Sequence, residues 1–191
     1  AGTHAYITTA KAENKFGVNL AEAEELLVRY AHLPFVSISG IHIHIGSQIT
    51  KTEPFVEAIT KTLKFMDRMK KKGIVFTFLN LGGGIGITYK DEKPPTPAHY
   101  ARKILPLIKT RGYKIIFEPG RYIVGNAGAF VTKVTYEKKA LAKNFLIVDG
   151  AMNDLVRPSL YKAYHEAVPV TKTAKSEKLV YDVVGPICES G

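Results

Sequence analysis

The chain has 191 residues, 46% of them hydrophobic and 23% charged, which is typical of a folded globular protein and argues against a disordered or fibrous one. Lys and Arg outnumber Asp and Glu by 27 to 17, for a formal net charge of +10, and a single cysteine, Cys188, excludes an internal disulfide. No apolar run approaches the ~18 residues needed to span a bilayer, so we expect no membrane-spanning helix and no membrane partner.

The first predicted elements are a helix and a strand. Asn19 and Glu22 match the capping-box pattern at a helix start, and an apolar stripe with helical spacing continues from there to Tyr30. Residues 35–45 are rich in β-branched and aromatic side chains between a proline and a glycine, which predicts a strand.

A second helix and a second strand follow. Residues 52–72 carry apolar side chains three and four positions apart, and Gly73 stands where such a helix would end. Residues 75–81 form an apolar, strand-like run, which is followed directly by the triple glycine at residues 82–84.

The third helix is predicted after a proline-rich stretch. Thr96 and Pro97 suit its N-cap and its first turn, and Pro106 is expected to kink or end it. Residues 113–117 then predict a third strand. Strands that alternate with helices at this spacing are typical of βαβ units, so residues 1–122 predict an α/β domain with a parallel sheet.

Beyond residue 122 the helical patterns almost disappear. One short helical segment is predicted near residues 154–161, and strand-like runs occur at residues 129–137, 145–148, 167–170 and 179–184. We therefore place a boundary near residues 122–127 and expect residues 123–191 to form a mostly β domain.

Polar residues and glycines gather where the predicted strands end. His42 and His44 alternate with isoleucines, so both imidazoles should face one side of their strand, and Ser47 follows in the next turn. The triple glycine at residues 82–84 follows the second strand, and residues 118–121, Glu-Pro-Gly-Arg, follow the third. Because the carboxyl ends of parallel strands in a β/α barrel meet at one mouth, we expect one site there.

The residue types at this edge suit pyridoxal phosphate. Glycine-rich turns expose backbone N–H groups to a phosphate, to which Ser47 adds a hydroxyl. The flat imidazole of His44 is suited to stack on an aromatic ring, and the carboxylate of Glu118 is suited to hold a proton on a ring nitrogen. His42 taken alone is interpreted as a hydrogen-bonded structural histidine. A metal site is disfavoured, because no acidic or cysteine cluster surrounds the two histidines.

Seven stretches in sequence order carry a more specific signal: residues 15–17, 42–48, 80–84, 118–121, 149–154, 157–161 and 185–190. Together they resemble the diaminopimelate decarboxylase family, within the alanine-racemase-like (fold-type III) class of pyridoxal-phosphate enzymes. The resemblance implies the closing part of a (β/α)8 TIM-like barrel, followed by part of a C-terminal β-rich domain. It also implies the decarboxylation of meso-2,6-diaminopimelate to L-lysine and CO2, the last step of lysine biosynthesis, which places the protein in the cytoplasm.

The same resemblance implies roles for individual residues. For the cofactor these are His44 against the ring, Glu118 at the pyridinium nitrogen, and Ser47, Gly83, Gly84, Gly120 and Arg121 around the phosphate and the rest of the molecule. For the amino-acid substrate they are Arg121, Arg157 and Tyr161 at the distal carboxylate and Glu189 at the distal amino group. Cys188 is implied as a catalytic proton donor beside His44, and Cys188 and Glu189 as residues that reach the neighbouring active site of a head-to-tail homodimer.

The family's cofactor-linking lysine belongs to an earlier motif that this sequence lacks. The chain also starts at Ala1 and stops just after a strand-like run, so we expect a piece of a longer protein that is inactive by itself.

Other functions stay open at this stage. A related decarboxylase that acts on ornithine or arginine is disfavoured by Arg157 and Tyr161, whereas one that acts on carboxynorspermidine is harder to exclude. A pyridoxal-phosphate carrier without turnover is disfavoured by the predicted β domain. A nucleic-acid partner is disfavoured because the basic residues are scattered, and their densest run, residues 70–72, lies at a helix end.

Overall fold

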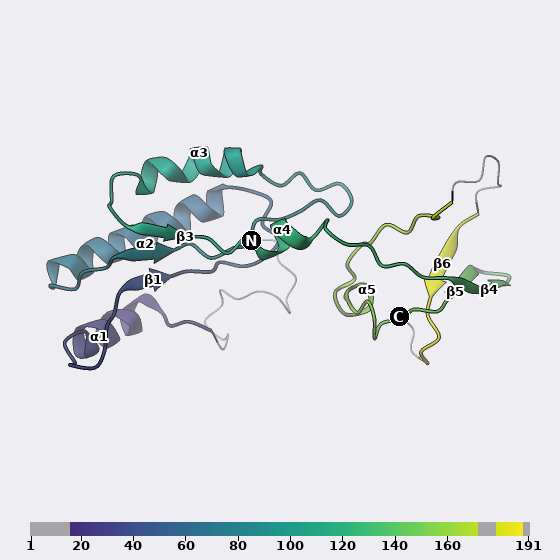
Figure 1. The fold of residues 1–191 in the computed structure, drawn as a ribbon, viewed down its shortest axis with the longest axis horizontal. Coiled ribbons are helices and arrows are strands. Elements are labelled where there is room, and N and C mark those ends of the chain that lie inside the picture. Colours follow the sequence, from purple (N-terminus) through teal and green to yellow (C-terminus); the bar gives the residue numbers. More distant parts are fainter. Residues whose placement is uncertain (1–15, 172–178, 189–191) are drawn as a thin grey trace. The chain divides into compact units, whose positions relative to one another are not determined.

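The computed structural model describes residues 16–171 and 179–188, and it divides into two compact units (Figure 1). The first unit comprises the chain up to Thr88 together with Glu92–Ala127, and the second comprises Tyr89–Asp91 together with the chain from Gly128 onward. No helix in the described residues is long and apolar enough to cross a membrane. Lys15, Glu189 and Ser190, which belong to the motifs named above, lie outside the described residues.

The first unit is an α/β structure whose three strands form one parallel sheet in the order β1-β2-β3. Its elements in chain order are α1 (Leu20–Tyr30), β1 (Gly40–His42), α2 (Glu53–Lys71), β2 (Phe78–Asn80), α3 (Pro97–Ile108), β3 (Lys114–Ile116) and α4 (Gly120–Val124). Ile41 pairs with Leu79, and Leu79 pairs with Ile115, so the three strand ends are in register. The parallel sheet predicted from the sequence is confirmed.

The core of this unit lies between the sheet and the apolar faces of α2 and α3. Its buried side chains include Phe55, Ile59, Leu63, Met66 and Met69 from α2, Leu79 from β2, and Tyr100, Ile104 and Ile108 from α3. The rings of Phe55 and Tyr100 meet edge to face with their centroids 5.0 Å apart. Burial also raises the pKa of the Tyr100 phenol to about 12. The helical spacing of apolar residues in the sequence is therefore the spacing of one packed face.

The helix boundaries follow from their capping residues. The Asn19 side chain accepts a hydrogen bond from the Glu22 amide, and Thr96 caps α3 by accepting one from the His99 amide over 3.2 Å. Gly73 follows α2 with a φ of +84°, a conformation that glycine adopts without strain. Pro106 does not end its helix, which continues to Ile108, although a proline there has no N–H to donate to the preceding turn.

The strands of the first unit are shorter than the sequence predicts. The predicted runs at 35–45, 75–81 and 113–117 contain strands of only three residues each, with β1 and β3 at the open edges of the sheet. A strand needs a ladder partner, and Phe35, which begins the first run, is 100% exposed. The short helix α4 was not predicted, because residues 120–124 carry no helical capping pattern.

The second unit contains β4 (Val134–Lys139), β5 (Asn144–Val148), α5 (Arg157–Tyr161) and β6 (Tyr181–Val184). β4 pairs antiparallel with β5, and β5 pairs parallel with β6. The first strand thus starts later than the predicted 129–137, and the predicted strand at 167–170 is wrong. Val168 and Val170 are 70% and 87% exposed, and Pro169 between them has no N–H to give to a ladder.

Candidate functional site

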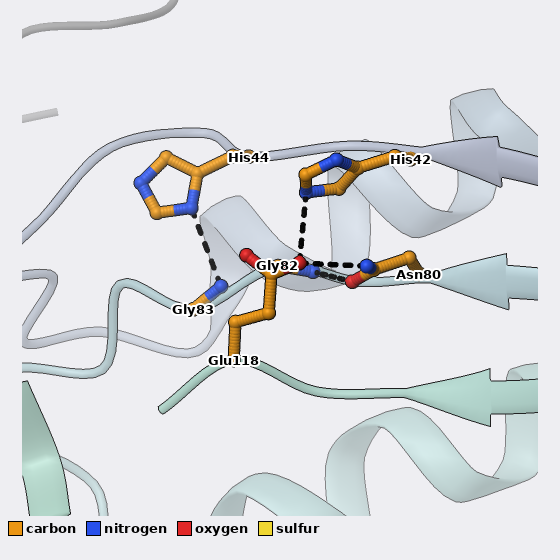
Figure 2. A network of polar contacts seen from close by, with 6 residues as sticks. All are labelled: His42, His44, Asn80, Gly82, Gly83 and Glu118. Carbon is orange, nitrogen blue, oxygen red and sulfur yellow. Dashed lines mark hydrogen bonds and ion pairs between the residues drawn. The ribbon is translucent and has the colours of Figure 1, made fainter. Parts of the chain in front are cut away.

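The carboxyl ends of the three parallel strands lie side by side and bring polar residues together (Figure 2). His42 is the last residue of β1, Asn80 is the last residue of β2, and Glu118 lies just after β3. The Glu118 amide donates a hydrogen bond to the Gly82 carbonyl over 2.8 Å. This bond continues the ladder between the second and third strands past their ends, so the backbone itself places Glu118 beside the triple glycine.

The Glu118 carboxylate is held on one of its two oxygens. The Asn80 side-chain amide donates to Oε1 over 2.7 Å, and Nε2 of His42 lies 3.5 Å from the same atom. The Asn80 carbonyl oxygen accepts from the Gly82 amide over 2.9 Å. The side chains of His42 and Glu118 are 52% and 46% exposed, so the group is open to a ligand.

His44 is tied to the same turn. Its Nδ1 lies 3.3 Å from the amide nitrogen of Gly83, which donates to it, as Figure 2 shows. His44 therefore approaches the glycine turn that follows β2 from the chain that leaves β1, whereas His42, at the end of β1, meets Glu118. The structure brings His44, the triple glycine and Glu118 together at one edge of the first unit.

Close backbone packing explains the triple glycine without any ligand. A Cβ atom on Gly82 would meet the Ile43 carbonyl, one on Gly83 would meet the Glu118 carbonyl, and one on Gly84 would meet the Gly46 carbonyl. Gly82 and Gly84 also have φ values of +64° and +104°. Gly120 differs, because a Cβ atom there would have no atom within 4 Å. Packing within the described residues thus does not require a glycine at position 120.

Gln48 has a structural role that the sequence analysis did not assign. Its Nε2 donates to the Ile87 carbonyl over 2.5 Å, while its Oε1 accepts from the Ile87 amide over 3.1 Å and from Nη1 of Arg121 over 3.4 Å. Gln48 thus joins the turn after β1, the loop after the triple glycine and α4. Its φ of +57° marks an unusual backbone position, a feature that no sequence pattern signals. Ser47 precedes it and is partly exposed.

Arg157, Tyr161 and Cys188 belong to the second unit. The Arg157 guanidinium carbon lies 5.4 Å from the ring centroid of Tyr89 and 5.5 Å from that of Tyr161. Its Nε is buried and has no hydrogen-bond partner among the described residues. Cys188 is an exposed free thiol. Tyr89 is a residue that the sequence analysis missed, since a single aromatic residue in a loop carries no pattern.

Metal ligation finds no support in the described residues. No group of three or more His, Cys, Asp or Glu side chains within them is arranged to hold an ion.

Comparison with known proteins gives four relevant matches. Residues 1–125 match the family described as pyridoxal-dependent decarboxylase, pyridoxal binding domain. Diaminopimelate decarboxylases from Pseudomonas fluorescens and Haemophilus influenzae are each 47% identical over 191 residues, which is 100% of this chain and 46% of the relative. The crystal structure of diaminopimelate decarboxylase from Helicobacter pylori complexed with L-lysine matches with a TM-score of 0.91 at 43% identity, over 99% of this chain and 47% of that one. The chain therefore spans just under half the length of the relatives that it matches.

Proposed function

Since this chain belongs to the pyridoxal-dependent decarboxylase family, we propose that it is part of an enzyme that converts meso-2,6-diaminopimelate to L-lysine and CO2. The observation that carries the proposal is 47% identity to diaminopimelate decarboxylases over the full 191 residues. The L-lysine in the complex of the Helicobacter pylori relative is the product of that reaction and supports the same substrate class.

We assign residues 1–122 to the closing part of a (β/α)8 barrel and residues 123–191 to part of a C-terminal β-rich domain. Three parallel strands with helices between them support the first assignment. A separate sheet of β4, β5 and β6 supports the second. In a barrel of this type the active site is built at the carboxyl ends of the strands, which is where the polar cluster of the first unit lies.

The donor set at the strand ends fits pyridoxal phosphate. The Glu118 carboxylate suits the ring nitrogen, because Oε1 is already bound by Asn80 and Oε2 has no partner among the described residues. The His44 imidazole is a flat group held beside the glycine turn. We propose that Ser47 and Gly84 give hydroxyl and amide donors to the phosphate. Gly83 and Gly120, whose amides already donate to His44 and to the Glu118 carbonyl, would line it, and the open space at Gly120 would admit it. Arg121 adds a positive charge nearby.

When bound, the cofactor supplies an electron sink for the pair released as CO2 leaves. We propose that Glu118 keeps a proton on the ring nitrogen, which strengthens that sink, and that His44 orients the ring. Cys188 then donates a proton to the carbon that has lost its carboxylate. Its thiol is exposed in this chain, which is compatible with a role at a site completed by a second copy in a homodimer.

Recognition of the substrate's far end is assigned to a second group of residues. Arg157, which lies near the rings of both Tyr89 and Tyr161, presents a planar guanidinium that suits a carboxylate. We propose that Arg157 and Tyr161, with Arg121, bind the distal carboxylate, and that Glu189 binds the distal amino group. Ornithine and arginine have no distal carboxylate, so this group would select against them.

The proposal is tested in a grafted enzyme, in which these 191 residues replace the matching segment of the Pseudomonas fluorescens relative. We expect the grafted enzyme to release CO2 and L-lysine from meso-2,6-diaminopimelate, and the 191-residue chain alone to be inactive, because it lacks the family's cofactor-linking lysine. A preference for ornithine, arginine or carboxynorspermidine would assign a related decarboxylase instead. Cofactor binding without any turnover would indicate a non-catalytic relative. We expect the activity in the cytoplasm, with the other steps of amino-acid synthesis.

A further inference from the structure

We propose that Asn80 and His42 are positioning residues, which fix the Glu118 carboxylate through Oε1 so that Oε2 faces the ring nitrogen of the cofactor. The inference rests on the proposed function of the same site. It assigns a role to His42, which the sequence suggested to be merely structural, and to Asn80, which the sequence left unassigned. The three side chains and the turn that they share are drawn in Figure 2.

Asn80 has no freedom to point its amide elsewhere. A backbone N–H can only donate, so the Asn80 atom that faces the Gly82 amide at 2.9 Å must be the carbonyl oxygen. The NH2 group is consequently directed at Glu118 Oε1, 2.7 Å away. The glycine turn thus sets the position and orientation of the Asn80 amide. The hydrogen bond from this amide in turn fixes the position of the Glu118 carboxylate.

The main chain of Glu118 is fixed by the same turn. Its amide donates to the Gly82 carbonyl, whereas the Gly82 amide donates to Asn80. Gly82 therefore anchors both the backbone of Glu118 and the side chain that holds its carboxylate. A long carboxylate side chain that is ordered before binding loses less rotamer freedom when a ligand arrives, which improves binding.

His42 approaches Glu118 Oε1 from the neighbouring strand. At 3.5 Å, its Nε2 makes a longer contact than the Asn80 amide does, and the side chains of His42 and Glu118 are about half exposed. We therefore assign the larger part of the positioning to Asn80. Because both partners meet Oε1, and Oε2 has no partner among the described residues, the free oxygen is the one available to a ligand.

One substitution distinguishes the positioning of Glu118 by Asn80 from the support that Asn80 gives to the glycine turn. Asn80→Asp keeps the oxygen that accepts from Gly82 but replaces the NH2 donor by a second oxygen that repels Glu118. In the grafted enzyme we expect kcat to fall, and the dissociation constant for added pyridoxal phosphate to rise, by about tenfold to a hundredfold, as expected for the loss of a hydrogen bond to a charged group. Equilibrium dialysis against pyridoxal phosphate measures this dissociation constant in the grafted enzyme.

The effect of Asn80→Asp should depend on the Glu118 charge. In a Glu118→Gln background, where the repulsion is gone, we expect Asn80→Asp to change cofactor affinity by less than about threefold, because only contacting groups show such coupling. His99→Ala is the matched control at a histidine outside the site, and we expect it to change neither quantity. For His42 we expect a smaller loss in His42→Leu, with partial recovery in His42→Gln, which retains a donor.

The outcomes separate the two proposals. If the unsubstituted grafted enzyme makes no lysine from meso-2,6-diaminopimelate, the proposed function fails. If it makes lysine, and Asn80→Asp retains its thermal midpoint, cofactor affinity and kcat, the positioning role is overturned. The positioning role would also be overturned if Asn80→Asp weakened cofactor binding equally in the presence of Glu118 and in the Glu118→Gln background. Asn80 would then act on the turn alone. Should Asn80→Asp not fold, Asn80→Ser and the His42 pair test the same point.

Discussion

The Gly83 amide donates a hydrogen bond to Nδ1 of His44 over 3.3 Å, so a side chain from the β1 end is tied to the turn after β2. An imidazole nitrogen that accepts a hydrogen bond carries no proton, which places the ring proton of neutral His44 on Nε2. The same contact sets the orientation of the ring. His44 is therefore held for a ligand before any ligand arrives.

Replacement of His44 by phenylalanine distinguishes the contribution of the flat ring from that of the hydrogen bond. His44→Phe keeps a flat aromatic group but leaves the Gly83 amide without its acceptor, at a partly buried position. We expect a loss of about 1–3 kcal/mol in the free energy of unfolding, the usual cost of an unsatisfied buried donor. Urea unfolding of the grafted enzyme measures it, with His99→Phe as the control. Equal stability of the two variants would show that the Gly83 amide finds another acceptor.

Gly83→Ala should be severely destabilising. The added Cβ would run into the Glu118 carbonyl oxygen, which belongs to backbone and cannot rotate away. We expect a loss of about 1–3 kcal/mol or more, as for other overpacked positions. Gly128→Ala is the matched control, since a Cβ there meets nothing within 4 Å. A thermal midpoint for Gly83→Ala close to that of Gly128→Ala would contradict the close approach of the strand ends.

Tyr89 should affect substrate binding through Arg157. The guanidinium lies over the rings of Tyr89 and Tyr161, and a cation over an aromatic ring gains about 0.5–2 kcal/mol. We expect Tyr89→Ala to raise KM for meso-2,6-diaminopimelate by about twofold to thirtyfold, whereas Tyr89→Phe, which keeps the ring, changes it little. Tyr136→Ala on exposed β4 serves as control. If Tyr89→Phe raises KM as much as Tyr89→Ala does, substrate binding depends on the Tyr89 hydroxyl and not on its ring.

Glu24 gives the first unit a pH-dependent contact between α1 and α2. Its carboxylate lies 2.7 Å from Nζ of Lys72 and 2.8 Å from a guanidinium nitrogen of Arg68. The hydrogen bond from Lys72, together with Arg68, holds the pKa of Glu24 below its ordinary value of 4.5. A lowered folded-state pKa adds stability above the unfolded-state value, and this stability is lost as the pH falls through the lowered one.

Glu24→Gln should therefore lower the thermal midpoint at pH 7 and have progressively less effect as the pH drops below 4.5. Because the carboxylate is partly exposed to solvent, added salt should also reduce the difference. Glu57→Gln is a useful comparison, since the ion pair that the described residues give Glu57, with Lys61, lies within α2. A difference between Glu24→Gln and the parent that is constant from pH 7 to pH 3 would mean that charge is not involved.

Local patterns were sufficient to predict the three longer helices, α1, α2 and α3. Helical spacing of apolar residues located α2 and α3, and Asn19 and Thr96 located two helix starts, because capping and amphipathic spacing act within a few residues of the chain. Strands were predicted less well. Their lengths depend on partners elsewhere in the sequence, so the exposed run at 167–170 has the composition of a strand without forming one.

The order of motifs along the chain was enough to indicate the family and to place His44, the triple glycine and Glu118 at strand ends. Only the tertiary structure showed what holds them there. Asn80 and Gln48 owe their roles to partners 38 and 39 positions away in the sequence, and no local pattern records such a contact. The alternation of side chains along a strand is a local property, whereas the atom that each side chain meets depends on how neighbouring strands are aligned.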